Sequence, residues 1–459
     1  MTTARELARR GWSVAVLEAG RIGGGASGRN CGFVLPGFGE TMPRIVERVG
    51  PQRAREMWDF ADAGRAYVHD TIRDTNMPGV DPINGWLWVS KFATDWSLRA
   101  EVDDLRTQYD ADVELWPTDR VRTALRSSLY FNAVHYRSAF HIHPLNYALG
   151  LAAAAEADGV RIFEETPALS LDAAGVRKRI ATPSARVRAG QIVLAGNVTL
   201  GALMPRLAAT LAPLTTFVAV TEPLGEGLND AVRYAGAISD TNRGDNHYRI
   251  VGGDRLLWSG GMRMWSADPR RFGRRLAADI RRVYPQLGKI SIAHVWAGTL
   301  GRTVHRMPQI GQLSSGLWVA SGFGGHGLNT TAMAGMLIAR AIAQGDASWR
   351  TFQPYELVWA GGLAGRALMQ AGYAGVRLRD RAKFLVARAR RAITPEPAPS
   401  PESATGGAML DPAPTTATIL QTPSGDDNAE PNRRRPTKAA TAVFAQSAET
   451  SVPAVDETA

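Results

Sequence analysis

The chain has 459 residues, 45% of them hydrophobic and 21% charged, so it can bury cores in more than one domain and is not wholly disordered. Its single cysteine, Cys31, excludes an internal disulfide and also zinc or iron–sulfur sites built from cysteines. The formal net charge is +10, but the basic residues are scattered without interleaved stacking aromatics, so we do not expect nucleic-acid binding.

The first residues predict the second half of a dinucleotide-binding unit. Apolar residues recur at helical spacing from Thr3 to Arg10, and Gly11 ends this predicted helix. A short apolar strand, Val14 to Leu17, follows and is closed by Glu18. A carboxylate at this strand end accepts hydrogen bonds from a ribose in such units, so Glu18 is a cofactor-binding candidate. An ordinary exposed glutamate is the alternative.

The glycine fingerprint that should precede this helix is not in the sequence. In dinucleotide-binding units its last glycine lies roughly 20 residues before the acid, which places the fingerprint and its strand ahead of Met1. We therefore expect a misassigned start, with a truncated, non-catalytic remnant unable to hold a cofactor as the alternative. A chain without this segment is expected to bind a dinucleotide weakly and to lack the central strand of its parallel sheet.

The same N-terminal segment bears on location. The apolar stretch before Glu18 is too short for a secretory signal peptide, and no run of about 18 apolar residues occurs elsewhere. We expect a cytoplasmic protein without a membrane-spanning helix.

A glycine-rich segment, Gly20 to Phe33, follows the predicted strand and has six glycines in fourteen positions. Such a segment permits close backbone approach to a ligand, with polar side chains able to contact phosphate or ring oxygens; a plain mobile loop is the alternative. The cofactor-binding candidates here are Gly25, Ala26, Ser27, Arg29, Asn30 and Gly32.

The stretch LARRGWSVAVLEAGRIGGGASGRNCGF resembles the flavin-binding region of the D-amino-acid-oxidase superfamily, and within it the γ-glutamylputrescine oxidase branch. Cys31 stands where that branch commonly has glycine. The resemblance implies non-covalent FAD, because the cysteine used for covalent attachment in related sarcosine oxidases is absent from the C-terminal part. It also implies oxidation of an amine or amino acid by hydride transfer to flavin N5, giving an imine that water hydrolyses.

Two central segments extend the resemblance. Phe140 to Val160 reads as a strand, a proline and an alanine-rich helix, and it is similar to the segment leading to the adenine side, where Ala168 would face the cofactor. Gln191 to Asn197 is similar to a second flavin-side crossing, with Gly196 and Asn197 as candidates. His141 and His143 alternate on one predicted strand, but no acidic or histidine cluster completes a metal site, so we expect no metal.

The strongest downstream similarity covers Trp296 to Gly311 and Leu317 to Ala334, which resemble the two C-terminal flavin motifs of the superfamily. The second motif predicts a strand, a glycine-rich loop and a helix whose N-terminal N–H groups would stabilise negative charge on a reduced flavin. His305 stands where the family pattern usually has an acid. Arg302 and His326 are the catalytic candidates. The cofactor-binding candidates of the loop are Gly322, Gly324, Gly325, His326, Gly327 and Leu328.

Short β-rich segments between these motifs predict a substrate domain. Trp86, Trp88, Tyr248 and Trp258 are candidates to line a pocket for an aliphatic amine, with core packing as the alternative for each. Arg249 and Arg302 are candidates to bind a substrate carboxylate, and surface solvation is the alternative for Arg249.

The C-terminal part predicts helix and then disorder. Residues 375–393 form a basic amphipathic helix, expected either to close the body or to contact a membrane surface. Residues 394–459 are rich in Pro, Ala, Thr, Ser and Glu, so we expect a disordered tail.

The expected fold class is α/β, with a three-layer, Rossmann-like FAD-binding domain and an α+β substrate domain on a mixed, largely antiparallel sheet. Residues 1–45, 140–212 and 290–350 are assigned to the first domain, 46–139 and 213–289 to the second, and 351–393 to closing helices. The expected function is FAD-dependent oxidation of an amine or amino acid, with oxygen or quinone as electron acceptor. A membrane-docked flavin dehydrogenase that reduces quinone, and the remnant described above, are the alternatives.

Overall fold

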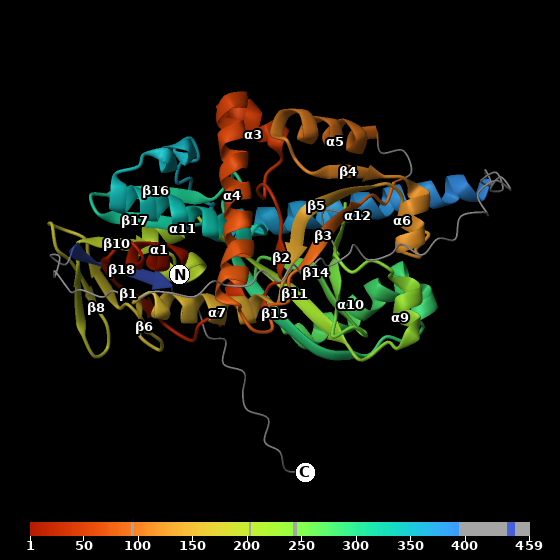
Figure 1. Cartoon of the computed structure of the whole chain (residues 1–459). Coiled ribbons are helices and arrows are strands. Elements are labelled where there is room, and N and C mark those ends of the chain that lie inside the picture. The colour runs from red at the N-terminus through yellow and green to blue at the C-terminus, as the bar shows by residue number, and fades with distance from the viewer. Residues whose placement is uncertain (93–95, 202, 242–245, 394–437, 446–459) are drawn as a thin grey trace, which may run out of the picture. The chain divides into compact units, whose positions relative to one another are not determined.

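The computed structural model describes residues 1–92, 96–201, 203–241, 246–393 and 438–445 (Figure 1). Its contacts separate a main unit, which contains Met1–Arg377 and the segment from Lys438, from a second unit that begins at Leu378. The main unit contains two large sheets and one small sheet. No helix among the described residues is long and apolar enough to cross a membrane.

A six-stranded sheet forms the half of the main unit that contains the N-terminus (Figure 1). Its order is β16-β17-β10-β18-β1-β6, and all neighbours are parallel except β16 and β17. The strands are β1 (Trp12–Glu18), β6 (Arg161–Phe163), β10 (Gln191–Leu194), β16 (Gln309–Ser314), β17 (Leu317–Ser321) and β18 (Lys438–Ala445).

The central strand of this sheet comes from the C-terminal end of the chain. β18 pairs in parallel with β1 on one side and with β10 on the other, and Val443 aligns with both Val16 and Val193. The expectations of a missing central strand and of a tail disordered throughout 394–459 are therefore corrected for Lys438–Ala445. The physical reason is that a gap between β1 and β10 would leave buried backbone groups unpaired, and the sequence AATAVFA is small and apolar enough for a central parallel strand. The rest of the predicted tail lies outside the described residues.

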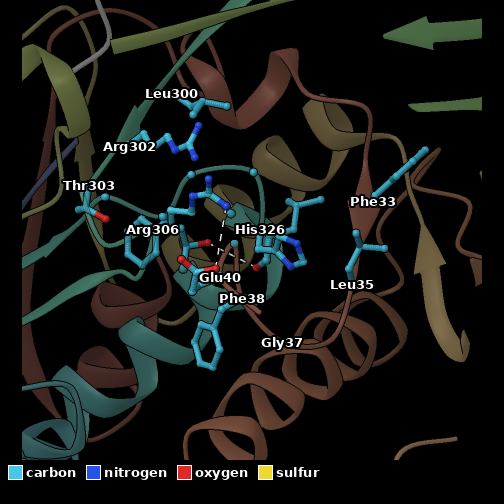
Figure 2. Close-up of a pocket in the computed structure, with 18 of the residues that line it drawn as sticks. Phe33, Leu35, Gly37, Phe38, Glu40, Leu300, Arg302, Thr303, Arg306 and His326 are labelled. Carbon is cyan, nitrogen blue, oxygen red and sulfur yellow. Dashed lines mark hydrogen bonds and ion pairs between the residues drawn. The ribbon is translucent and has the colours of Figure 1, made fainter. Parts of the chain in front are cut away.

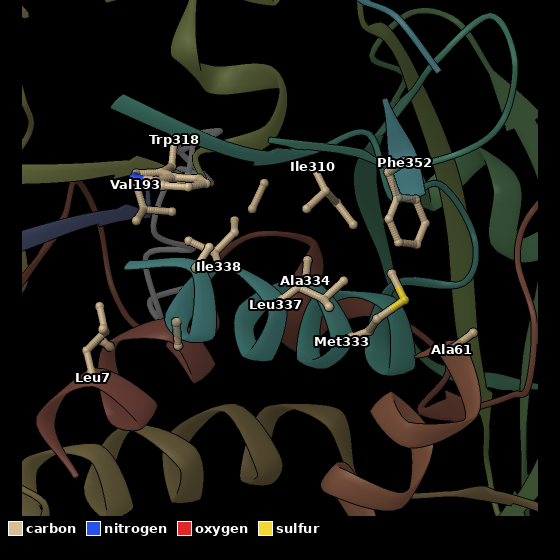
Figure 3. Close-up of a cluster of buried hydrophobic side chains, with 14 of the residues drawn as sticks. Leu7, Ala61, Val193, Ile310, Trp318, Met333, Ala334, Leu337, Ile338 and Phe352 are labelled. Atoms are coloured by element: carbon tan, nitrogen blue, oxygen red, sulfur yellow. The ribbon is translucent and has the colours of Figure 1, made fainter. Parts of the chain in front are cut away.

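Helices cover one face of this sheet and a small sheet covers the other. On the helical face, α1 (Thr2–Ala8), α4 (Pro51–Thr75) and α11 (Gly327–Gln344) share one apolar cluster with β1 and β17. Figure 3 shows Leu337 and Ile338 of α11 beside Val193 and Trp318 of the sheet. On the other face, the antiparallel strands β7 (Ser170–Asp172), β8 (Lys178–Ala181) and β9 (Arg186–Ala189) contribute Ile180 to a cluster with the sheet. The three-layer arrangement is confirmed.

A nine-stranded sheet forms the other half of the main unit, in the order β15-β11-β14-β13-β12-β3-β5-β2, with β4 paired to β5. All its neighbours are antiparallel except β12 and β3, so the expected mixed, largely antiparallel sheet is confirmed. The strands are β2 (Phe33–Val34), β3 (Ile83–Val89), β4 (Val113–Trp116), β5 (Ala133–His141), β11 (Ala212–Thr221), β12 (Ala237–Asp240), β13 (His247–Val251), β14 (Arg255–Arg263) and β15 (Ile292–Arg302).

Two strands of this sheet lie inside segments that the sequence assigned to the cofactor domain. β2 pairs with β5, and β15 pairs with β11 over nearly its whole length. The expected boundaries at 45 and 290 thus do not follow the division between the sheets. The long pairing with β11 places β15 in the nine-stranded sheet, although the sequence at its C-terminal end resembles a flavin motif.

The remaining helices connect or cover the sheets. They are α2 (Ala26–Arg29), α3 (Met42–Val49), α5 (Trp96–Tyr109), α6 (Thr118–Ala124), α7 (Pro144–Ala157), α8 (Pro205–Ala208), α9 (Glu226–Ala231), α10 (Pro269–Val283) and α12 (Gly362–Ile393), with 3-10 turns at Asn197–Leu200, Pro285–Leu287 and Ser348–Phe352. The expected helix of residues 375–393 is the second part of α12.

Candidate functional site

A cavity of about 2200 Å³ is lined by residues from both large sheets. Its volume exceeds the roughly 300–1,000 Å³ of a typical small-molecule pocket, so it has room for a dinucleotide and a second small molecule. The lining also includes α5 and the first half of α12, which places elements from distant parts of the sequence around one space.

One end of the cavity is formed by the predicted dinucleotide-binding unit. Met1, Thr2 and Thr3 at the start of α1 line it, together with Glu18 at the end of β1. Glu18 is buried, and one of its carboxylate oxygens accepts a hydrogen bond of 2.8 Å from the Gly20 N–H. The carboxylate is thereby fixed at the strand end, with its side chain bordering the space where a ribose would lie.

The glycine-rich segment contributes fewer ligand-facing groups than the sequence suggested. Ala26, Ser27 and Asn30 line the cavity. The Asn30 side chain, however, closes its own loop: its amide donates to the carbonyls of Ala26 at 3.0 Å and Ser27 at 2.8 Å, and its oxygen accepts from the Gly32 N–H at 2.7 Å.

Three other candidates of this segment, Gly25, Arg29 and Gly32, do not line the cavity in the described structure. The Arg29 carbonyl accepts a hydrogen bond of 3.0 Å from the Trp296 indole, which ties the segment to β15. Gly32 has φ of +83°, and a Cβ there would lie 1.9 Å from the Ile142 carbonyl oxygen. We attribute this glycine to backbone packing, because any side chain would displace β5.

Of the three candidates in the two central segments, one lines the cavity. Asn197 lines it in a left-handed conformation with φ of +53°, and its amide donates to the Thr299 carbonyl at 3.5 Å. Gly196 precedes the 3-10 turn at Asn197, and Ala168 packs against the apolar cluster between the two sheets of this half. Gly196 and Ala168 are not among the cavity-lining residues of the described chain.

The glycine-rich loop before α11 borders open space, as predicted. Gly322, Gly324, Gly325, Gly327 and Leu328 all line the cavity with His326. A Cβ added at Gly324, Gly325 or Gly327 would meet no atom within 4 Å. Because α11 is 18 residues long and begins at Gly327, its first N–H groups lie at the edge of this space.

His326 is the N-cap residue of α11 and lies among the lining side chains in Figure 2. Burial, reinforced by the nearby His247, lowers the pKa of His326 to about 4, so its imidazole is neutral at pH 7. Its Nδ1 atom is buried and has no hydrogen-bond partner among the described residues. A polar group in the cavity would satisfy it.

Two arginines line the cavity near the C-terminal end of β15. Arg302, the last residue of β15, lines it and forms an isolated β-bridge with Phe323 of the glycine-rich loop. Arg306 forms an ion pair of 3.9 Å with Glu40, and Figure 2 shows this pair near Arg302 and His326. Arg302 thus borders the cavity, and its catalytic role stays a prediction. His305, in contrast, is not a lining residue of the described cavity, and its Nε2 lies 3.1 Å from the Glu356 carbonyl.

The other end of the cavity is an aromatic wall from the nine-stranded sheet. Trp86 and Trp88 both line it, because residues two apart on β3 point to the same face. Trp86 is stacked on Tyr136 with ring centroids 4.6 Å apart, and its indole donates to Ser239 Oγ at 2.9 Å. Two carboxylates one turn apart on α5, Glu101 and Asp104, line the same cavity.

The substrate-pocket candidates on β13 and β14 lie elsewhere. Tyr248 and Trp258 are directly paired, fully buried and stacked at 4.1 Å, and the Tyr248 hydroxyl is 2.7 Å from that of Tyr284. The prediction that these two line the pocket is corrected by the alternation of the strands. The neighbouring pair, His247 and Ser259, points to the opposite face and lines the cavity.

Arg249 also makes its hydrogen bonds within the protein. Its guanidinium donates to the carbonyls of Cys31 at 2.9 Å and Ile142 at 3.0 Å and lies 3.2 Å from His141 Nδ1. Burial lowers its pKa to about 10, which leaves it cationic at pH 7. The expected carboxylate-binding role is therefore corrected for Arg249, whose contacts join the segment around Cys31 to β5.

The histidines considered for metal binding have structural contacts. The Nε2 atom of His141 lies 3.0 Å from the Ala235 carbonyl, while His143 caps α7 by accepting from the Asn146 N–H at 3.2 Å. Burial and the Arg249 charge lower the pKa of His141 to about 4.

The lining residues that were not singled out from the sequence include four polar ones on α5, β12 and β13: Glu101, Asp104, Ser239 and His247. Their residue types are common on any surface helix or strand. For His247 the alternation of β13 could have provided a signal, had the buried face been known. No local pattern marks the two carboxylates of α5, since only the tertiary fold brings this helix to the cavity.

The residues present fit a flavin dinucleotide at its ring and ribose ends. A polar ring would find space beside Gly324, Gly325 and Gly327 and a hydrogen-bond partner in Nδ1 of His326. A ribose would find the fixed carboxylate of Glu18. In this chain the central strand β18 is not followed by α1, because the two elements lie far apart in the sequence. No short turn therefore joins the central strand to the start of α1.

Comparison with known proteins gives a consistent result. The family model described as FAD dependent oxidoreductase matches residues 1–341. Gamma-glutamylputrescine oxidoreductase of Escherichia coli is 31% identical over 350 residues, covering 76% of this chain and 82% of that protein. A probable oxidoreductase, OrdL, of Haemophilus influenzae is 28% identical over 360 residues, covering 77% and 82%. The crystal structure of glycine oxidase from Geobacillus kaustophilus superposes with a TM-score of 0.62 at 18% identity, covering 78% of this chain and 95% of that one, which shows the fold.

Proposed function

Because the chain belongs to the FAD dependent oxidoreductase family, we propose that it oxidises the carbon–nitrogen bond of an aliphatic amine or an amino acid. One observation carries the proposal: a single cavity extends from the glycine-rich loop at α11 to an aromatic wall with two carboxylates. Two similar proteins, a gamma-glutamylputrescine oxidoreductase and a glycine oxidase, have nitrogen-containing substrates in their names, which supports this substrate class.

FAD, held by Glu18 and the glycine-rich loop before α11, would supply the two-electron oxidation of the carbon–nitrogen bond, and water would hydrolyse the resulting imine. The protein's own residues then have three tasks. The N–H groups at the start of α11 and the adjacent glycine loop would stabilise negative charge at the flavin. Neutral His326 would hydrogen-bond a polar edge through its free Nδ1. Arg302 would pair with a carboxylate when the substrate carries one.

The aromatic wall would orient the amine. A protonated amine is attracted to the faces of Trp86 and Trp88 and to the carboxylates of Glu101 and Asp104. Residues of α12, including Met369 and Tyr373, line the same cavity and would limit entry of water.

The first experiment is the visible absorption spectrum of the purified chain after addition of FAD and desalting. Retained bands near about 375 and 450 nm would show bound oxidised flavin. Candidate amines are then added under anaerobic conditions, and a substrate bleaches the longer-wavelength band. Re-oxidation by oxygen and by a soluble quinone, compared on the same sample, identifies the acceptor. A folded protein that remains colourless contradicts the proposal and supports the cofactor-free remnant.

A pair of variants tests the substrate end. Asp104→Asn should raise KM for a cationic amine by about 3-fold to 10-fold, since one partly exposed charge contributes up to about 1.4 kcal/mol. Asp103→Asn is the matched control, because Asp103 lies on the same helix and is exposed like Asp104, but does not line the described cavity. Equal KM values for the two variants would show that Asp104 on α5 does not bind the substrate.

A further inference from the structure

We propose that the first half of α12 and the residues just before it dock on an anionic lipid bilayer. The docking patch consists of Leu357, Val358, Trp359, Leu363 and Leu368, which are large apolar side chains exposed to solvent. Trp359, Leu363 and Leu368 are 68%, 72% and 75% exposed. Monomeric soluble proteins rarely leave large apolar side chains gathered in this way unless the surface binds something.

The patch is extended by the outward face of the helix itself. At 100° per residue, the exposed positions from Leu363 to Ala374 fall on one side of α12 and carry no polar side chain. These positions are Leu363, Ala364, Ala367, Leu368, Ala371, Gly372 and Ala374. The polar side chains of the same segment, Arg366 and Gln370, lie on the inner half of the helix and are partly buried. A surface helix that packs on its own protein normally shows the reverse pattern.

The inner face of the helix is already occupied by the protein. Gly365, Met369 and Val376 line the cavity, and the Gln370 side-chain oxygen accepts from the Met264 N–H at 3.1 Å. The helix therefore cannot bury its outer leucines by rotating without losing these contacts. Trp359 and Leu368 belong both to the patch and to the cavity lining, so the patch borders the mouth of the cavity.

The basic residues of α12 indicate which partner binds the docking patch. Between 377 and 393, the sequence of α12 contains seven basic residues and one acidic residue. These like charges would make two copies of the chain repel each other, which disfavours a second copy as the partner. A bilayer containing anionic lipid attracts a basic sequence, with about 1 kcal/mol for each basic residue near the surface, and its headgroup boundary takes up exposed apolar side chains. Tryptophan is enriched at that boundary, as Trp359 would be.

Vesicle co-sedimentation tests the proposal with the full chain. Vesicles of phosphatidylcholine alone are compared with vesicles of phosphatidylcholine and phosphatidylglycerol, at low and high salt. The chain should sediment with the anionic vesicles and be partly released by salt. The measurement is made with and without FAD, so its failure is distinguishable from failure of the proposed oxidation. A wild-type chain that stays in the supernatant overturns the proposal.

Two double variants separate the patch from general apolar exposure. Leu363→Glu with Leu368→Glu should lower the bound fraction by about 10-fold or more, because charged side chains do not enter the headgroup boundary. Leu169→Glu with Val176→Glu is the matched control, since these apolar residues are 59% and 88% exposed and lie outside the patch. Circular dichroism melting confirms that both variants fold.

Equal sedimentation of the patch variant and the wild type would overturn the proposal. So would a wild-type dimer that becomes monomeric in Leu363→Glu with Leu368→Glu while neither form binds vesicles, because the face would then be an interface between copies. Replacement of Arg388 and Arg390 by glutamate should reduce binding to anionic vesicles selectively, and unchanged binding would remove the electrostatic part of the argument.

Discussion

The two large sheets of this protein are completed in different ways. Every strand of the nine-stranded sheet comes from residues 33–302, and its core includes a buried tyrosine network around Tyr248. The six-stranded sheet depends on β18, which enters between β1 and β10 from the far end of the sequence. The comparison teaches that the six-stranded sheet depends on a strand far away in the sequence, whose pairing costs more loop-closure entropy, whereas residues 33–302 complete the nine-stranded sheet by themselves.

The largest expected effect follows from breaking β18. Val443→Pro should destabilise the six-stranded sheet by about 3 kcal/mol or more, because proline removes a ladder hydrogen bond in a central strand that pairs on both sides. Hydrogen exchange should show faster exchange in β1 and β10 than in β11 and β14. Thr450→Pro, outside β18, is the control. Unchanged protection of β1 in Val443→Pro would show that β18 is not needed.

A smaller effect is expected from removing the arginine that joins the segment around Cys31 to β5. Arg249→Met should cost about 2–4 kcal/mol of unfolding free energy, since it leaves the buried carbonyls of Cys31 and Ile142 without their donor. Chemical denaturation measures the loss. Arg271→Met, at an exposed position, should change stability by less than about 0.5 kcal/mol. A loss in Arg249→Met no larger than in this control would show that the contacts contribute little.

Acid should weaken the protein through two buried histidines. Burial lowers the pKa of His141 and of His326 from 6.5 to about 4, so the folded state binds fewer protons than the unfolded state between these values. Their contribution is complete above about pH 6.5 and is lost as pH falls through about 4, with a slope of at most about 1.4 kcal/mol per pH unit for each histidine. Denaturation at several pH values measures it.

The histidine substitution sharpens this test. His326→Gln should flatten the pH dependence between about 4 and 6.5, because it removes one of the histidines that binds fewer protons in the folded state. His69→Gln is the control, since that side chain lies on the exposed side of α4. If both variants retain the wild-type slope, His326 does not contribute to acid sensitivity.

The smallest effect is expected in the core of the nine-stranded sheet. Tyr248→Phe should cost about 1–2 kcal/mol, because the Tyr130 and Tyr284 hydroxyls lose their shared partner. Thermal unfolding measures this loss. Flavin content and KM should not change, since Tyr248 lies behind the cavity wall. A change in KM without a change in stability would instead show that Tyr248 contacts the substrate.

Sequence patterns predicted the parts of the site that depend on local backbone. The helix, glycine, strand and acid from Thr3 to Glu18 form α1 and β1, and the loop from Gly322 to Gly327 borders the cavity before a long helix. Glycine spacing and helix starts are encoded in consecutive residues, which is why these motifs could be identified without a structure. Arg302 and His326 also reach the cavity, since they follow directly from those motifs.

The choice among aromatic residues could not be made in this way. Trp86 and Trp88 line the cavity while Tyr248 and Trp258 are buried behind it, although all four lie in similar apolar strands. A shift of one residue along a strand moves a side chain to the opposite face, and only the pairing of β12, β13 and β14 fixes which face borders the cavity.

The sequence by itself determined the family and the three-layer plan, because these rest on short segments with characteristic backbone conformations. The tertiary structure alone decided that β18 fills the centre of the six-stranded sheet, that α5 brings Glu101 and Asp104 to the cavity, and that Arg249 serves packing. These outcomes depend on contacts between residues far apart in the chain, and their free energies come from pairing and burial that no local pattern contains.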